Sequence, residues 1–218
     1  DLNKSRLAMD SLNNHLVDRK NSLILLLKPP FDKTPKEPGY IKGYAPGIRE
    51  NGGQYTHSAI WAIMAFAKLG ENQRAWELLS IINPINHGKT NKEILTYKVE
   101  PYVVAADIYT NPQHIGRGGW TWYTGSAGWM YQLIVESLIG LRVEIDKLRF
   151  VSPCLPEEWK SFKLHYRYRE TFYHINIVIT GMGNNVIKVL LDGTELENKE
   201  IILVDDHREH SAEVEIGT

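Results

Sequence analysis

The chain has one cysteine, no long apolar run and almost no net charge. Because Cys154 is alone among 218 residues, no internal disulfide can form, and a reducing compartment is expected. No window approaches about 18 uninterrupted apolar residues, the length that a membrane-spanning helix requires. The formal net charge of −1 gives no electrostatic basis for binding nucleic acid or an anionic membrane. We therefore expect a cytoplasmic protein with no nucleic-acid partner.

Several familiar signals are also missing. There is no signal peptide, and the chain begins at Asp1 without an initiator methionine, entering a helical pattern almost at once. This start predicts a piece of a larger protein. The sequence contains no P-loop, dinucleotide fingerprint, zinc-ligand spacing or nucleophile elbow, so neither a metal nor a cofactor is expected.

Aromatic residues, in contrast, are abundant and clustered. The chain has six Trp and eleven Tyr, and four of these lie within ten residues: Trp120, Trp122, Tyr123 and Trp129. Four glycines alternate with them. Aromatic rings beside permissive glycine backbone suit a polar, ring-shaped ligand such as a sugar. A buried aromatic core is the alternative interpretation.

The patterning changes near Asp146. Before it, apolar residues at helical spacing predict helices over 4–19, 56–69, 72–82, about 100–109, and from Thr124 or Gly125 to 141. After it, period-two alternation predicts short strands over 162–168, 173–180, 186–191, 201–204 and 212–216. We therefore expect a mainly α region at 1–146 and a small antiparallel β domain at 147–218.

The first of three polar junctions between elements runs from Gly43 to His57. It contains four glycines, the charged pair Arg49–Glu50, and a histidine that opens the helix at 56–69. Polar, glycine-rich loops on a rigid scaffold are where sites tend to lie. Alternatively, Glu50 is a solvated loop acid and His57 is a satisfied histidine at a helix start.

The second and third junctions also open predicted helices. Glu100 precedes Pro101, and its carboxylate there would be stabilised by a helix N-terminus without any functional role. Thr124, Gly125 and Ser126 open the last helix, where small residues leave the first N–H groups accessible to an anion. Simple helix capping by Thr124 and Ser126 is the alternative. A phosphate beside an aromatic sugar platform would suggest phosphorolysis.

At these junctions the sequence resembles glycoside hydrolase family 94, the inverting phosphorylases of β-linked sugars. The motifs that carry the resemblance are Arg49-Glu50-Asn51-Gly52, His57, Asn83-Pro84, Glu100-Pro101-Tyr102-Val103, and the segment from Trp122 to Trp129. The stretch from Gly43 to His57 resembles most the branch acting on β-1,2-glucans, which includes oligoglucan phosphorylases and the C-terminal region of cyclic glucan synthases. The resemblance implies an (α/α)6 barrel, of which 1–146 would be the later part, followed by a β-sandwich.

The resemblance also implies roles for individual residues. Phosphate would be bound by His57, Thr124 and Gly125, and sugar by Arg49, Glu50 and Glu100, while Trp120 and Trp122 could offer ring faces. No catalytic residue is expected here, because the family's general acid lies in an earlier loop that these 218 residues lack. An isolated fragment should therefore be inactive.

The implied enzyme cleaves a β-glucan or oligosaccharide with inorganic phosphate as co-substrate, giving a sugar 1-phosphate. A homodimer is a further expected partner, since the family's soluble members are often dimers. Ala105-Ala106 replaces a glutamine of the disaccharide phosphorylases, which argues against cellobiose specificity. Two alternatives stay open: an inverting hydrolase using Glu50 or Glu100, and a non-catalytic glycan-binding module of a cyclic glucan synthase, whose parent could be membrane-associated.

Overall fold

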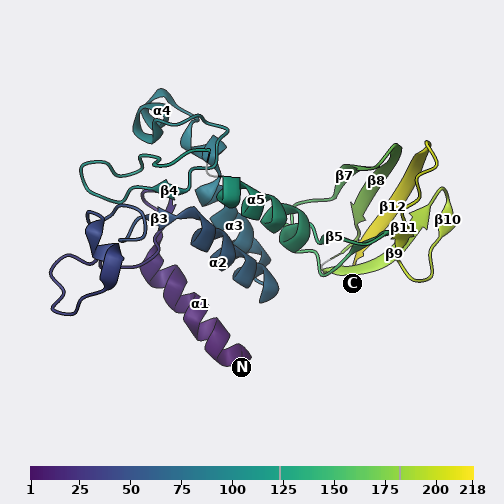
Figure 1. Cartoon of the computed structure of the whole chain (residues 1–218). Helices are drawn as coiled ribbons and strands as arrows, with labels where there is room; N and C mark the ends of the chain where they lie inside the picture. Colours follow the sequence, from purple (N-terminus) through teal and green to yellow (C-terminus); the bar gives the residue numbers. More distant parts are fainter. Residues whose placement is uncertain (123, 182) are drawn as a thin grey trace. The chain divides into compact units, whose positions relative to one another are not determined.

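The chain forms two compact units, Asp1–Leu133 and Ile134–Thr218. A computed structural model describes residues 1–122, 124–181 and 183–218 (Figure 1), so Tyr123 of the aromatic cluster lies outside the described residues. Within these ranges, no helix combines the length and the apolar character needed to cross a bilayer.

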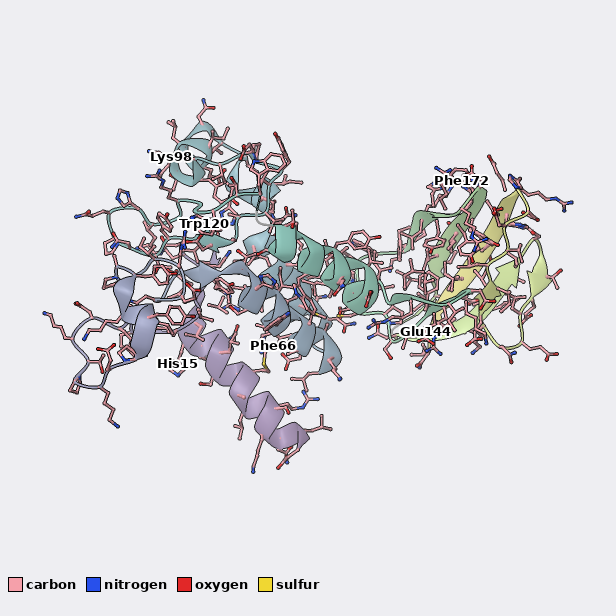
Figure 2. All side chains as sticks on the ribbon, viewed as in Figure 1. His15, Phe66, Lys98, Trp120, Glu144 and Phe172 are labelled. Atoms are coloured by element: carbon pink, nitrogen blue, oxygen red, sulfur yellow. The ribbon has the colours of Figure 1, made fainter. Side chains whose placement is uncertain are left out.

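The first unit is built on helices that pack around α2. In chain order the helical elements are α1 (Leu2–Leu16), η1 (Gly39–Gly43), α2 (Thr56–Lys68), α3 (Asn72–Ile82), η2 (Pro84–His87), α4 (Asn91–Tyr97) and α5 (Thr124–Gln132). Helix α2 contacts α1, α3 and α5. Its apolar side chains Ile60, Ile63 and Phe66 are fully buried, as is Leu78 of α3. Figure 2 labels Phe66 among the side chains of the helical unit. The junction loops begin or end at these helices.

Two short pairs of antiparallel strands join segments that lie between these helices in the sequence. Strand β1 (Val17–Asp18) pairs with β2 (Leu23–Ile24), and β3 (Gln54–Tyr55) pairs with β4 (Asp107–Ile108), both antiparallel. In the second pair, Tyr55 lies opposite Asp107. The N–H of Thr56 donates to the Ala106 carbonyl at 2.9 Å, and its hydroxyl donates to the Ala105 carbonyl at 2.6 Å. The start of α2 is thereby joined to the segment after α4.

The second unit is a sandwich of two sheets. Its first residues belong to η3 (Leu133–Leu138), a π-helix that follows α5 and of which only Leu133 falls in the first unit. The strands are β5 (Leu141–Glu144), β6 (Lys147–Phe150), β7 (Ser161–Tyr168), β8 (Thr171–Ile179), β9 (Asn185–Leu191), β10 (Thr194–Glu195), β11 (Ile201–Ile202) and β12 (Glu209–Gly217). They form a three-stranded sheet, β11-β6-β5, and a five-stranded sheet, β10-β9-β12-β8-β7. Leu148 and Phe150 of the first share one core with Tyr173, Ile177 and Val214 of the second.

The predicted mainly α class is wrong. Helices account for 32% of the chain and strands for 26%, because the sandwich and the paired junctions carry many strand residues. The sandwich is also not purely antiparallel, since β8 and β12 run parallel to each other. The helix expected over 100–109 is absent: Pro101–Val103 form a turn, and Asp107–Ile108 are strand β4, held by pairing with β3.

The domain boundary expected at 146/147 stays a prediction. The contacts divide the chain between Leu133 and Ile134, and β5, which ends at Glu144, already pairs with β6 of the sandwich.

Candidate functional site

The loop that carries Arg49 and Glu50 is organised by Asn51. This side chain is fully buried. Its Nδ2 donates to the carbonyls of Phe31 and Tyr44, both at 2.8 Å, and its Oδ1 accepts the Phe31 N–H at 2.7 Å. Because all three partners are backbone groups, Asn51 fixes two neighbouring segments against its own loop. The following residue, Gly52, has a φ of +87°, and a Cβ there would lie 2.9 Å from the Pro30 Cβ.

Arg49 and Trp120, both predicted sugar-binding residues, are in direct contact. The Arg49 guanidinium carbon lies 3.5 Å from the centroid of the Trp120 ring and 5.4 Å from that of Tyr44. This is a cation–π arrangement, which orients both side chains. Arg49 itself has a φ of +48°, an uncommon backbone conformation for a residue with a side chain. Trp120 remains 52% exposed, so much of its ring surface is open.

Asp107, which the sequence interpretation missed, lies behind this pair. Its side chain is buried, and its Oδ1 accepts the Trp120 N–H at 3.0 Å. Burial raises the pKa of Asp107, while the Trp120 N–H, the Arg49 guanidinium and the Arg49 backbone act in the opposite direction. Its other oxygen, Oδ2, finds no hydrogen-bond partner within the described ranges. The only sequence signal was a single acid within the otherwise apolar run Val103–Ile108.

Glu50 contributes a second buried carboxylate oxygen at the same place. The side chain is half-buried, and its Oε2 has no hydrogen-bond partner among the residues that the structure describes. Its charge is close enough to raise the pKa of Asp107. A buried acceptor without a donor is costly. The sugar-binding role of Glu50 stays a prediction.

His57 and Gly125 are brought together as predicted for a phosphate site. His57 lies in the first turn of α2, and its Nδ1 is 3.4 Å from the Ser126 hydroxyl oxygen in α5. A Cβ on Gly125 would lie 2.9 Å from the His57 Cε1, so the glycine is what lets the ring approach the start of α5. Thr124 and Gly125, the first two residues of α5, are exposed. The role of all three in binding phosphate stays a prediction.

Aromatic rings surround the imidazole of His57. Tyr55 stacks on it with ring centroids 5.9 Å apart, and Trp61 and Trp129 lie edge-on at 6.0 and 6.5 Å. Trp61 and Trp129 also contact each other at 5.4 Å. Sequence reasoning had placed Trp129 in an aromatic cluster but had missed Trp61, whose partners become visible only when α2 and α5 are packed together.

Glu100 and Trp122 are the two remaining residues predicted to bind sugar. Glu100 lies in a loop after α4, half-buried, and its backbone carbonyl accepts the Val103 N–H at 3.0 Å. Since the helix expected at 100–109 is absent, the helix N-terminus invoked for Glu100 is absent too. Trp122 is 69% exposed and has a φ of +61°. Their sugar-binding roles stay predictions without support from these contacts.

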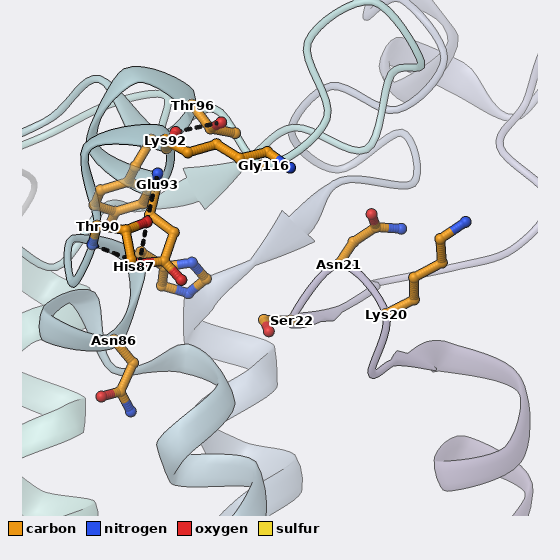
Figure 3. A pocket seen from close by; sticks show the side chains of 11 residues that line it. Lys20, Asn21, Ser22, Asn86, His87, Thr90, Lys92, Glu93, Thr96 and Gly116 are labelled. Atoms are coloured by element: carbon orange, nitrogen blue, oxygen red, sulfur yellow. Dashed lines mark hydrogen bonds between the residues drawn. The ribbon is translucent and has the colours of Figure 1, made fainter.

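A polar cavity of about 270 Å³ lies elsewhere in the first unit (Figure 3). It is lined by the turn between β1 and β2, including Lys20 and Asn21, and by His87 and Thr90. Burial lowers the pKa of His87, whose Nε2 bonds to the Ile81 carbonyl at 2.9 Å. None of the eight predicted site residues lines this cavity. In the described ranges, no group of three or more His, Cys, Asp or Glu side chains could hold a metal ion.

Comparison with known proteins agrees with the resemblance stated above. Residues 1–140 match the catalytic domain of the glycosyl hydrolase 94 superfamily, and the chain belongs to this family. It is 46% identical over 204 residues to a cyclic beta-(1,2)-glucan synthase of Rhizobium meliloti, covering 90% of this chain and 7% of that protein.

Two phosphorylases are also similar. An N,N'-diacetylchitobiose phosphorylase of Vibrio furnissii is 32% identical over 193 residues, with 87% of this chain and 23% of the relative covered. A 1,2-beta-oligoglucan phosphorylase of Listeria innocua is 32% identical over 131 residues, with 54% and 12% covered. The chain thus spans less than a quarter of the length of each of these three relatives.

Proposed function

We propose that the chain forms the phosphate-binding side, and part of the sugar-binding side, of an inverting phosphorylase acting on β-linked glucans. The enzyme would transfer a glucosyl unit from the glycan to inorganic phosphate, giving a sugar 1-phosphate and a shortened chain. The general acid that protonates the leaving oxygen would come from outside these residues. Inorganic phosphate would be a co-substrate rather than a cofactor.

The observation that carries the proposal is the approach of His57 to the start of α5. Phosphate must be held against its own charge before it can attack the anomeric carbon. The Thr124 hydroxyl, the N–H groups in the first turn of α5, which have no carbonyl partner within the helix, and the His57 ring would provide donors from two helices. Gly125 supports this arrangement, because a side chain there would collide with the His57 ring.

The sugar side would be formed by Arg49, Glu50 and Trp120. The exposed part of the Trp120 ring would pack against a pyranose face, and the half-buried Glu50 carboxylate would accept a sugar hydroxyl. These contacts orient a substrate without taking part in bond breaking, so they suit a fragment without the general acid. The predicted contributions of Glu100 and Trp122 have less support from the geometry.

A second candidate function is favoured by the 46% identity to a cyclic glucan synthase. In such a parent, this region would bind glycan without phosphorolysis, or would transfer glucosyl units within a larger assembly. The substrates, the homodimer and the cellular location of the parent are proposals in both cases.

The deciding experiment measures glucose 1-phosphate formation by the full-length parent from β-1,2-gluco-oligosaccharides, with and without inorganic phosphate. Phosphate-dependent product would support the phosphorylase. Equal release of reducing sugar without phosphate would replace it with an inverting hydrolase. No turnover under either condition, with retained glycan binding, would favour the non-catalytic module.

A further inference from the structure

The Asp107 carboxylate lies where two loops of the candidate sugar site meet. One loop carries Arg49 and Glu50, and the other runs from Gly118 to Trp120. Backbone hydrogen bonds hold the second loop to β4: the Gly119 N–H donates to the Asp107 carbonyl at 2.8 Å, and the Ala106 N–H donates to the Trp120 carbonyl at 2.7 Å. The Trp120 N–H then donates to the Asp107 side chain.

The close approach of Gly119 shows how tightly this carboxylate is held. A Cβ added to Gly119 would lie 2.3 Å from the Asp107 Oδ1, a distance that no unstrained structure allows. Only glycine lets the backbone of this loop lie directly against the carboxylate. The Asp107 side chain is only 2% exposed, so a glycan could not reach it without rearrangement.

The other side of Asp107 faces the Arg49 loop. Both the Arg49 backbone and the Arg49 guanidinium stabilise the charged carboxylate. The same guanidinium lies over the Trp120 ring, and the backbone N–H of Trp120 donates to that carboxylate. Asp107 therefore interacts with both partners of the cation–π pair. It accepts a hydrogen bond from the Trp120 backbone, and its charge attracts the Arg49 guanidinium.

We propose that Asp107 is a positioning residue for glycan binding, which holds the Arg49–Trp120 pair as one wall of the sugar site. It acts through these two residues and touches no substrate itself. Its negative charge compensates the arginine, and the hydrogen bond that it accepts from the Trp120 backbone N–H fixes the backbone that carries the indole. This inference rests on the proposed sugar-binding role of Arg49 and Trp120.

The test compares Asp107→Asn and Asp107→Ala in the full-length parent. Asn keeps the shape and one acceptor but removes the charge, while Ala removes both. We expect the KM for β-1,2-gluco-oligosaccharide to rise about tenfold in Asp107→Asn and further in Asp107→Ala, with the KM for phosphate changed less than about twofold. Asp10→Asn, which removes an exposed carboxylate of α1, is the matched control and should change neither value.

Glycan binding is measured in parallel by calorimetry without phosphate, so that failure of the phosphorylase proposal can be recognised separately. Weaker glycan binding by Asp107→Asn supports the positioning role even if the parent makes no sugar 1-phosphate. If Asp107→Ala does not fold, Gly119→Ala tests the same contact from the opposite side and should also weaken glycan binding. Equal rises in both KM values, or unchanged glycan binding by Asp107→Asn, would overturn the inference.

Discussion

At the scale of single residues, His57 and Thr124 are the side chains whose loss should separate phosphate binding from glycan binding. A hydrogen bond to a charged group is worth about 1.5–3 kcal/mol, which corresponds to roughly a tenfold to hundredfold change in binding. In the full-length parent we therefore expect His57→Ala and Thr124→Ala each to raise the KM for phosphate at least about tenfold. Steady-state kinetics with each substrate varied in turn would check this.

The glycan KM is the internal control for this prediction. His57 and Thr124 are not among the residues assigned to the sugar, so the glycan KM should change less than about twofold. Parallel rises in both KM values would indicate a general disturbance of the α2–α5 contact, and the phosphate assignment would then be withdrawn.

The sequence predicted some site residues and could not predict others. His57, Gly125 and Arg49 were predicted from motifs, and their roles stay predictions, while the structure adds that His57 lies against Gly125 and that Arg49 contacts Trp120. Asp107 was missed because it stands in no motif. Its importance comes from the loops that fold against it from both sides, and such long-range contacts leave no local pattern.

At the scale of elements, α5 offers a matched pair of glycines. Replacing a glycine within a helix by alanine stabilises it by about 0.5–1 kcal/mol. A Cβ at Gly128 would meet nothing within 4 Å, whereas one at Gly125 would meet the His57 ring at 2.9 Å. We expect Gly128→Ala to leave the phosphate KM unchanged, and Gly125→Ala to raise it severalfold by displacing the ring.

Thermal denaturation and kinetics on the two α5 variants would test this together. Gly128→Ala should raise the melting temperature slightly. Gly125→Ala should raise it less, because the collision of the new methyl group with the His57 ring opposes the gain in helix propensity. If Gly125→Ala binds phosphate as well as Gly128→Ala does, then the closeness of His57 to the start of α5 has no role in binding.

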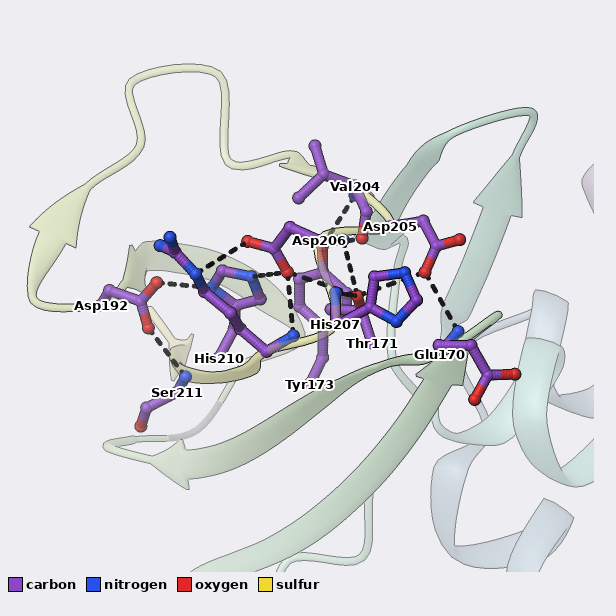
Figure 4. Close-up of polar contacts among 11 residues, drawn as sticks. Glu170, Thr171, Tyr173, Asp192, Val204, Asp205, Asp206, His207, His210 and Ser211 are labelled. Atoms are coloured by element: carbon purple, nitrogen blue, oxygen red, sulfur yellow. Dashed lines mark hydrogen bonds and ion pairs between the residues drawn. The ribbon is translucent and has the colours of Figure 1, made fainter.

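In the sandwich, His210 joins three separate segments (Figure 4). Its Nδ1 lies 2.6 Å from Asp192 in the β9–β10 turn, its Nε2 lies 3.3 Å from Asp206 before β12, and its ring stacks on Tyr173 of β8. The hydrogen bond to Asp192 is the main cause that raises the pKa of His210, and the same bond lowers the pKa of Asp192. The contact therefore makes the stability of the sandwich depend on pH.

The two groups set opposite limits to this contribution. The stability that His210 contributes is fully present below its ordinary pKa of 6.5 and is lost as the pH rises through its raised pKa. The stability that Asp192 contributes is present above its ordinary pKa of 3.8 and is lost as the pH falls through its lowered pKa. We expect the denaturation midpoint of the wild-type sandwich to fall as the pH rises from 6.5 through the raised pKa of His210, and to fall less in His210→Gln. His207→Gln, an exposed neighbour, should behave as the wild type does.

Local sequence patterns predicted helices and turns well where the conformation of a segment depends mainly on its own residues. The helices at 56–69 and 72–82 were confirmed as α2 and α3, and Asp192-Gly193 forms the expected hairpin turn. Helix α4 was missed although Thr90 and Glu93 form a capping box, which is a readable signal. The helix at 100–109 was wrong because pairing with β3 outweighed local propensity. The parallel pairing of β8 with β12 joins strands far apart in sequence and had no local signal.

At the scale of the whole molecule, the chain covers less than a quarter of the length of each of the three relatives. The site described here offers donors for phosphate and surfaces for sugar, but no described residue is assigned to protonate the leaving oxygen. In an inverting reaction that proton transfer is indispensable. We therefore expect the isolated 218-residue chain to form no glucose 1-phosphate from β-1,2-gluco-oligosaccharides, while the full-length parent forms it in the presence of phosphate.

Complementation distinguishes a missing general acid from a damaged fold. The chain would be mixed with the separately produced remainder of the parent, and product formation would be followed with and without phosphate. Recovery of activity that is lost again with Thr124→Ala would place phosphate binding in this chain and the acid in the remainder. Activity of the isolated chain would contradict this assignment of the acid to the remainder, because one of the chain's own carboxylates would then have to act as the acid. Glu50 and Asp107 would be the first to be replaced.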